Sequence, residues 1–176
     1  TATNGWVYAQ KVAGVQCVGQ VSSALGNFDL AQIGAFAHHD WSAGYMRPET
    51  HWNWACLSGQ AGAQRVGLNL SCGVNETSFT ENCFWLDGEL HKVDTVRFAF
   101  DRDQPLQPWQ INSFDDQVEL HFEGRGLHKE RLNLGFLASN FKQIFGQFNG
   151  VLRPTGRPEV RIENLWGFVE DQYVKW

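Results

Sequence analysis

Hydrophobic and polar residues alternate along most of this chain in short runs, and this is the period of a β-strand. In residues 117–122 the apolar side chains Val118, Leu120 and Phe122 all fall on one face. Gly, Asn, Asp and Pro residues separate such runs at close intervals, and no stretch has the period of an amphipathic helix. The pattern predicts an all-β protein of about a dozen short antiparallel strands.

Turn residues set the expected boundaries of the strands. Asp87-Gly88 is typical of a two-residue hairpin turn. Gly44 and Pro48 indicate a loop over residues 40–48, and a closing hairpin is expected around Trp166-Gly167. Strands are expected at residues 6–11, 15–21, 28–36, 51–58, 65–72, 84–86, 90–92, 93–100, 109–111, 117–122, 141–152, 160–165 and 168–176.

Glycines inside the expected strands favour a curved sheet. Gly146 and Gly150 suit bends or bulges, which help a sheet to curl and close. A barrel is therefore preferred to an open sandwich. No repeat or linker divides the 176 residues, so residues 1–176 are expected to form one domain with a sizeable core.

Composition excludes several classes of partner. The net charge is −5, and the Lys and Arg residues are scattered, so no basic stripe is available for nucleic acid. No apolar run reaches the roughly 20 residues that span a bilayer, and no signal-peptide pattern is visible. The four cysteines form no C-x-x-C pair and the six histidines lack metal-ligand spacing. We expect reduced thiols, a cytoplasmic location, and neither metal nor cofactor.

The first candidate for acid–base chemistry is the segment His38-His39-Asp40-Trp41. His38 and Asp40 are two residues apart, so on a strand they share a face, where the carboxylate can orient the imidazole as a general base. The alternative is ordinary capping and turn bonds at the edge of a loop.

The second candidate combines Thr80-Glu81-Asn82 with His91. In a cavity mouth, the acid and the amide could bind a hydroxylated ligand or protonate an alkene, and burial would keep the Glu81 carboxyl protonated. His91 lies near the Asp87-Gly88 turn, so a shared site requires the sheet to curve. The alternative is that Glu81 and Asn82 satisfy neighbouring backbone groups.

A third carboxyl, Glu170, shares a strand face with Phe168. If that face is interior, the carboxylate needs a partner, for which Arg97 or Arg161 are candidates in a structural ion pair. Asp171 would then face solvent.

The high tryptophan content is a further signal, since the chain has eight Trp residues. Trp52 and Trp54 share one face and could form an aromatic wall against an apolar ligand or a sugar ring. Core filling is the alternative, provided that each indole N–H finds an acceptor.

Several of these segments together resemble a bacterial family known as domain of unknown function 2804, from about Asp40 to the last residue. The segments that carry the resemblance are Thr50-His51-Trp52-Asn53-Trp54, Thr80-Glu81-Asn82, Asp87-Gly88-Glu89-Leu90-His91-Lys92, Pro108-Trp109, Phe145-Gly146-Gln147-Phe148-Asn149-Gly150, Gly167-Phe168-Val169-Glu170 and Lys175-Trp176. Members are typically about twice this length. The resemblance therefore implies the C-terminal half of a two-barrel protein, whose missing N-terminal barrel would be a partner.

A wider likeness is to lipocalin-like double-barrel proteins, which include carotenoid 1,2-hydratases and tocopherol cyclases. It implies a lipocalin-like (calycin-type) antiparallel β-barrel, although fold alone does not transfer function. The family often has an Arg-Gly pair before its Trp-x-Trp segment, where this chain has residues 42–47. Arg47 is expected to take the basic role, with Tyr45 beside it at the ligand. Without its partner barrel the chain would expose a face and form homo-oligomers.

Two functions of different class follow from these residues. One is a cofactor-independent hydratase, cyclase or isomerase that acts on a hydrophobic, terpenoid-like molecule. In that case Glu81, Asp40 or Glu170 is the acid and His38 or His91 accepts the proton. The other is a non-catalytic binding module for an apolar or amphipathic ligand, and a carbohydrate-binding or carbohydrate-processing domain is a third possibility. The catalytic hypothesis, which we favour, requires a buried acid that faces a cavity.

Overall fold

The computed structural model describes residues 6–74 and 80–176, and these residues form thirteen antiparallel strands and no helix. The all-β prediction is confirmed. The strands are β1 (Val7–Gln16), β2 (Gln20–Ser23), β3 (Gly26–Asp29), β4 (Phe36–Gly44), β5 (Glu49–Ala61), β6 (Gln64–Cys72), β7 (Cys83–Leu86), β8 (Glu89–Lys92), β9 (Val96–Ala99), β10 (Trp109–Ser113), β11 (Val118–Asn133), β12 (Ala138–Leu152) and β13 (Val160–Lys175).

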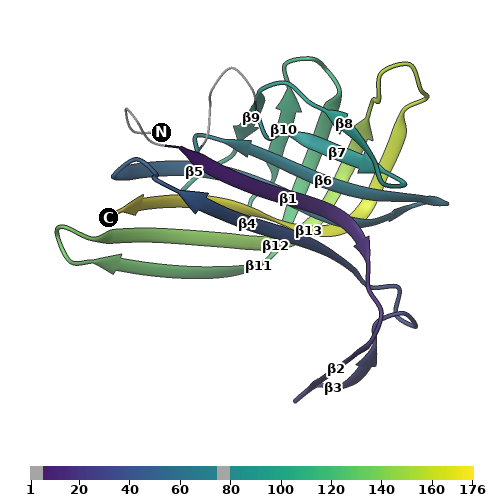
Figure 1. Cartoon of the computed structure of the whole chain (residues 1–176), viewed down its shortest axis with the longest axis horizontal. Helices are drawn as coiled ribbons and strands as arrows, with labels where there is room; N and C mark the ends of the chain where they lie inside the picture. Colours follow the sequence, from purple (N-terminus) through teal and green to yellow (C-terminus); the bar gives the residue numbers. More distant parts are fainter. Residues whose placement is uncertain (1–5, 75–79) are drawn as a thin grey trace.

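Nine of these strands make one sheet in the order β8-β7-β6-β5-β13-β12-β11-β10-β9. The sheet curls into a half-barrel (Figure 1). Within the described chain its edges are β8 and β9, which are not hydrogen-bonded neighbours, so closure into a complete lipocalin-type barrel is not confirmed. The coarser expectation of a strongly curved antiparallel sheet is correct.

The concave face of the half-barrel holds the main hydrophobic core. Alternation along β11 and β12 places one set of side chains inside, including Val118, Leu120 and Phe122, as predicted from the sequence. The largest fully buried side chains are Trp109, Phe84, Phe122, Phe148, Leu57, Leu68, Leu70, Leu86, Ile111, Ile144, Leu152 and Ile162. This half of the alternating pattern is therefore used for packing.

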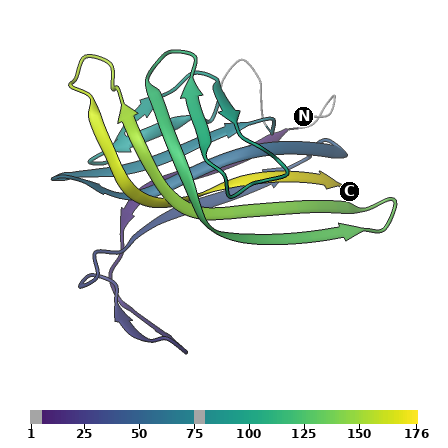
Figure 2. The ribbon, with the colours of Figure 1, turned by 180° about the vertical axis from the view of Figure 1, so that it is seen from behind.

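A two-stranded ribbon of β1 and β4 lies across the opposite face of the sheet, over β5 and β6 (Figures 1 and 2). The ribbon approaches closely at Gly14 and Gly67: a Cβ on Gly67 would lie 2.4 Å from the carbonyl carbon of Ala13. Ser58 adds two bonds, since its hydroxyl accepts from the Gly14 N–H at 2.9 Å and donates to the Ala37 carbonyl at 3.1 Å. These contacts fix one end of the ribbon against the sheet.

Beyond the ribbon, β2 and β3 form a separate hairpin arm that extends away from the sheet (Figure 1). Residues 28–36 were expected to be one strand, but β3 ends at Asp29 and turns follow it. The side chain of Asp29 accepts a bond from the Gln32 N–H at 2.9 Å, which stabilises the turn. The prediction of a loop at residues 40–48 is likewise wrong for its first half, because β4 continues to Gly44 through its pairing with β1.

The Asp87-Gly88 hairpin between β7 and β8 is confirmed. Both turn residues have positive φ, 53° and 91°, as a type I′ turn requires. The closing hairpin at Trp166-Gly167 is wrong, because β13 runs through both residues as one strand. Gly167 provides a close approach there instead of a turn, since an added Cβ would lie 2.3 Å from the carbonyl oxygen of Cys56. The strands are also longer than expected, and three of them have 15 or 16 residues.

Candidate functional site

A pocket of about 350 Å³ lies between the free end of the β1–β4 ribbon and the convex face of the sheet. It is therefore outside the half-barrel, whose interior is occupied by the main core. The residues that line it are Lys11, Asp40, Ser42, Met46, Trp52, Trp54, Ser71, Val74, Glu81, Phe141 and Glu170. Five apolar side chains, three carboxyl groups and one ammonium group thus share this space.

Alternation along β5 and β13 explains why these side chains meet. Trp52 and Trp54 are two residues apart, so both point to the convex face, and both line the pocket as a common aromatic wall. Glu170 is directly opposite Trp54 in the pairing of β13 with β5. The predicted shared face of Glu170 and Phe168 is correct, since the ring of Phe168 packs edge-on against Trp54 at 4.9 Å between centroids.

Glu170 is the buried acid of the pocket, with 6% of its surface exposed. Its carboxyl oxygens accept bonds from the Trp52 indole N–H at 3.1 Å and from the Gln143 amide at 2.8 Å. Burial raises the pKa of Glu170, against the opposing effect of these two hydrogen bonds. The expected arginine partners are wrong: neutral donors from β5 and β12 hold this group, and Arg161 pairs with Glu159 at 3.6 Å.

The ribbon contributes a lysine between the other two carboxyl groups. Lys11 Nζ lies 2.6 Å from Asp40 Oδ1 and 3.8 Å from Glu81 Oε1. The same ammonium lies 4.6 Å from the centroid of the Trp54 ring, within range of a cation–π interaction. Glu81 Oε1 is buried and accepts no hydrogen bond from the described residues, so the ion pair with Lys11 at 3.8 Å is its polar contact within this part of the chain. Lys11 therefore connects the ribbon to the sheet across the pocket.

His38 lies beside the pocket, on the same face of β4 as Asp40. Its ring packs on Phe168 at 5.1 Å and on Trp54 at 6.1 Å. Burial lowers the pKa of His38, while the Asp40 charge acts in the opposite direction. The lowered pKa favours the neutral imidazole, which lies against the rings of Trp54 and Phe168.

The remaining candidates from the sequence do not line this pocket. Asn82 is buried and satisfies backbone groups: its oxygen accepts from the Ser71 N–H at 2.6 Å and its amide donates to the Asp94 carbonyl at 3.2 Å. This is the structural alternative considered for Asn82.

His91 is on the other side of the sheet, stacked on the core residue Phe84 with ring centroids 5.0 Å apart. The structure therefore does not bring it together with Glu81. Arg47 is exposed and donates to the Gly73 carbonyl at 2.7 Å, while Tyr45 packs edge-on against Trp6 at 6.1 Å. Both lie outside the pocket lining.

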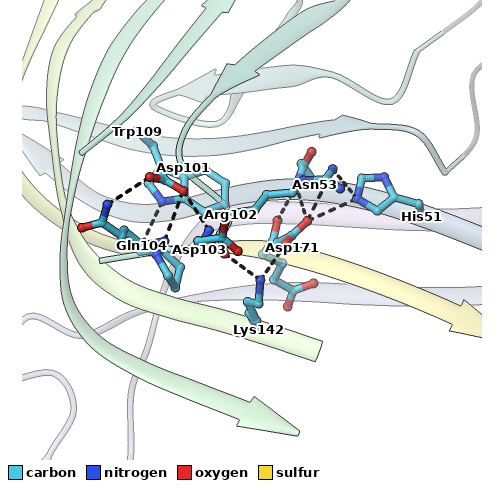
Figure 3. A network of polar contacts seen from close by, with 11 residues as sticks. His51, Asn53, Asp101, Arg102, Asp103, Gln104, Trp109, Lys142 and Asp171 are labelled. Carbon is cyan, nitrogen blue, oxygen red and sulfur yellow. Dashed lines mark hydrogen bonds and ion pairs between the residues drawn. The ribbon is translucent and has the colours of Figure 1, made fainter. Parts of the chain in front are cut away.

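A second polar network surrounds Asp171 on the concave face (Figure 3). Asp171 was expected in solvent, yet only 7% of it is exposed, because β13 is covered on both faces. Its carboxylate accepts from Lys142 at 3.3 Å and from the Asn53 amide at 3.3 Å. His51 Nε2 lies 3.2 Å from Asp171 and 2.8 Å from Arg102 Nη2. One ring nitrogen cannot donate to the carboxylate and accept from the guanidinium at once, so its proton decides which bond forms.

Sequence reasoning missed Lys11 and Phe141 as parts of the pocket lining, and Gln143 as a hydrogen-bond partner of Glu170. Lys11 lies in an expected strand, where it faces the same side as Ala13 and the sheet. The signal in the sequence was that Lys11 is a charged residue on the strand face expected to be buried. Gln143 and Phe141 carried no such signal, because their place beside Glu170 depends on the register of β12 against β13.

Two cysteines are buried, and Cys56 and Cys83 belong to the small apolar cluster beneath the ribbon. Burial raises the pKa of each thiol to about 12, so both stay protonated. No group of three potential metal ligands occurs within residues 6–74 and 80–176. In the same part of the chain there is no helix that could cross a membrane.

Comparison with known proteins identifies the family of the chain and no individual relative. No curated protein and no solved structure matches it. The family model described as "Domain of unknown function (DUF2804)" matches residues 2–176, which is more than the region from Asp40 expected from the motifs. This chain therefore belongs to the DUF2804 family.

Proposed function

We propose that this chain is a cofactor-independent hydratase, cyclase or isomerase that protonates a double bond of a hydrophobic, terpenoid-like molecule. The observation that carries the proposal is Glu170, a buried carboxyl with a raised pKa in the wall of an aromatic-lined pocket. A raised pKa keeps the proton on the acid at pH values where an exposed glutamate has lost it. Glu170 is therefore the acid, ahead of Asp40 and Glu81.

The proposed step moves one proton from Glu170 to an alkene carbon. The π electrons form the new C–H bond, leaving a carboxylate and a carbocation. Attack by water, attack by a second double bond, or loss of a neighbouring proton then gives hydration, cyclisation or isomerisation. Asp40, whose carboxyl group lies 2.6 Å from Lys11 Nζ, accepts the proton that is released.

The walls of the pocket suit such a cation. Trp52 and Trp54 offer π faces that stabilise positive charge as it develops, and Phe141 adds apolar surface on the β12 side. Trp52 also donates to Glu170, so it orients the acid toward the space that it lines. This proposal includes a longer two-barrel protein in which the half-barrel is closed into one lipocalin-like barrel. The basis for this part is an analogy of fold with the hydratases and cyclases of that type.

The second candidate is a non-catalytic binding module for an apolar or amphipathic ligand. The observation that favours it is that the charged groups of the pocket are already satisfied: Asp40 pairs with Lys11, and Glu170 accepts two bonds. In that case the pocket holds a ligand without chemical change.

Solvent deuterium distinguishes the two candidates. The chain is incubated in D₂O with a panel of acyclic and monocyclic terpenoid alkenes, and recovered molecules are analysed by mass spectrometry. Catalysis predicts deuterium bound to carbon, because the proton that Glu170 delivers exchanges with solvent. Glu170→Gln should abolish the incorporation but still bind the same alkene.

The matched control is Glu163→Gln, an exposed carboxyl on the same strand. It should incorporate deuterium as the unaltered chain does. Binding of an alkene with no deuterium on carbon would reject the catalytic proposal in favour of the binding module. Failure of every member of the panel to bind would reject both.

A further inference from the structure

The β11–β12 hairpin extends beyond the half-barrel (Figures 1 and 2), and the side chains at its turn are exposed and apolar. Residues 132–137 carry no charge. Phe136 is 78% exposed, Leu134 57% and Leu132 44%. Lys175 pairs with Ala138, so the C-terminal Trp176, itself half exposed, lies at the same end of the molecule. Large apolar side chains thus gather on a projecting end.

The strand that leads into this turn, β11, carries two exposed basic side chains near its end, in an otherwise acidic protein. Between residues 123 and 142 the basic side chains are Arg125, Lys129, Arg131 and Lys142. Two of them already have carboxylate partners: Arg125 pairs with Glu123 at 2.8 Å, and Lys142 pairs with Asp171 at 3.3 Å. The whole chain has a net charge of −5. Lys129 and Arg131 are exposed and form no ion pair with other described residues. Their positive charge is therefore available to a partner.

We propose that this end of the β11–β12 hairpin docks onto an anionic lipid surface. Apolar side chains enter the boundary between headgroups and acyl chains, while neighbouring Lys and Arg residues meet the anionic headgroups. Aromatic residues such as Phe136 and Trp176 suit the interface between water and lipid. The projecting turn exposes apolar side chains next to basic ones, and this combination suits an anionic lipid surface.

The β2–β3 arm shows what distinguishes the hairpin end. The arm also exposes apolar residues, with Leu25 90% and Val18 80% exposed. Residues 17–35, however, contain a single charge, Asp29, and it is negative. Anionic lipid therefore has no electrostatic attraction to the arm, and the arm provides a control of matched hydrophobicity.

Docking at this end places the pocket close to lipid. Phe141, which lines the pocket, comes three residues after Ala138 at the start of β12, a distance of about 10 Å along a strand. A hydrophobic substrate could then pass from lipid to the pocket along the hairpin. This last step rests on the proposed function, whereas docking itself does not.

Co-sedimentation with vesicles tests the proposal. The chain should bind vesicles of phosphatidylcholine mixed with phosphatidylglycerol, bind phosphatidylcholine alone much less, and lose binding as salt is raised. Lys129→Glu with Arg131→Glu should weaken binding by more than about 25-fold, since each lost cation accounts for about fivefold. Leu134→Ser with Phe136→Ser should weaken binding at least about tenfold.

The arm variant Val18→Ser with Leu25→Ser should bind like the unaltered chain, and so should Glu170→Gln. Because Glu170→Gln removes the proposed acid and leaves the hairpin end unchanged, vesicle binding by this variant separates a failure of docking from a failure of the catalytic proposal. Absence of binding to anionic vesicles, or equal losses in the hairpin and arm variants, would overturn the inference. The inference would also be overturned if the unaltered chain bound no vesicles and the variant Leu134→Ser with Phe136→Ser had a lower oligomeric mass than the unaltered chain. That result would show that the hairpin end binds a second copy of this chain.

Discussion

Replacement of Glu170 tests the physical basis of the site without knowledge of the ligand. Burial raises the pKa of this carboxyl above its ordinary value of 4.5. Below that value the folded and unfolded chains both hold the proton. As the pH rises from there through the raised pKa, the unfolded chain releases the proton first, so the free energy of unfolding falls. At higher pH the loss is complete and constant.

Glu170→Gln should remove this pH-dependent loss. The glutamine oxygen can accept from the Trp52 indole, and the Gln143 amide can turn over to accept from the new amide group. Both hydrogen bonds then persist, and the variant should be close to the unaltered chain at acid pH and more stable than it at neutral pH. Glu170→Leu instead leaves the donors of Trp52 and Gln143 without an acceptor, which should cost about 1–3 kcal/mol.

Urea unfolding followed by tryptophan fluorescence, repeated across a series of pH values, measures both effects. The difference in unfolding free energy between Glu170→Gln and the unaltered chain should grow as the pH rises above 4.5. Parallel curves for the two proteins would show that the carboxyl has an ordinary pKa and would refute the reasoning. Equal stability of the Gln and Leu variants would show that the two hydrogen bonds contribute nothing.

Two further substitutions test the ribbon and the second network. Gly67→Ala should destabilise the fold by about 2 kcal/mol in urea unfolding and reduce ligand retention, because the added Cβ would lie 2.4 Å from a backbone carbonyl carbon of β1. The control is Gly126→Ala, which should change stability little because the space around the added Cβ is open. Asp171→Asn should cost about 1–3 kcal/mol because Lys142 and Arg102 lose their buried counter-charge. Glu119→Gln, which removes an exposed ion pair, should cost less than about 1 kcal/mol, and equal costs for these two variants would contradict the argument.

Local patterns in the sequence predicted much of the fold. The alternation of Val118, Leu120 and Phe122 identified a buried strand face, and Asp87-Gly88 identified a turn whose positive φ values few other residues adopt. The shared face of Trp52 and Trp54 likewise followed from spacing alone. These features depend on neighbours within a few residues, so a single chain reveals them.

Glycine was the main source of error. Gly167 resembles a turn signal in the sequence, but within β13 it allows the backbone of β5 to approach closely. The same residue type serves both purposes, and only the neighbouring strand distinguishes them. The end of β4 was misjudged for another reason: pairing with β1 continues the strand through residues 40–44, where a loop was expected.

The sequence by itself determined the all-β class, the alternation that gives each strand two faces, and the side chains available for acid chemistry. Only the tertiary structure decided which face became the core and which became the pocket. Glu170 and Asp171 are adjacent in sequence, yet one lines the pocket beneath the ribbon and the other holds a network on the concave side. The physical reason is that strand register and the docking of β1 and β4 depend on contacts between distant segments, and no local spacing encodes them.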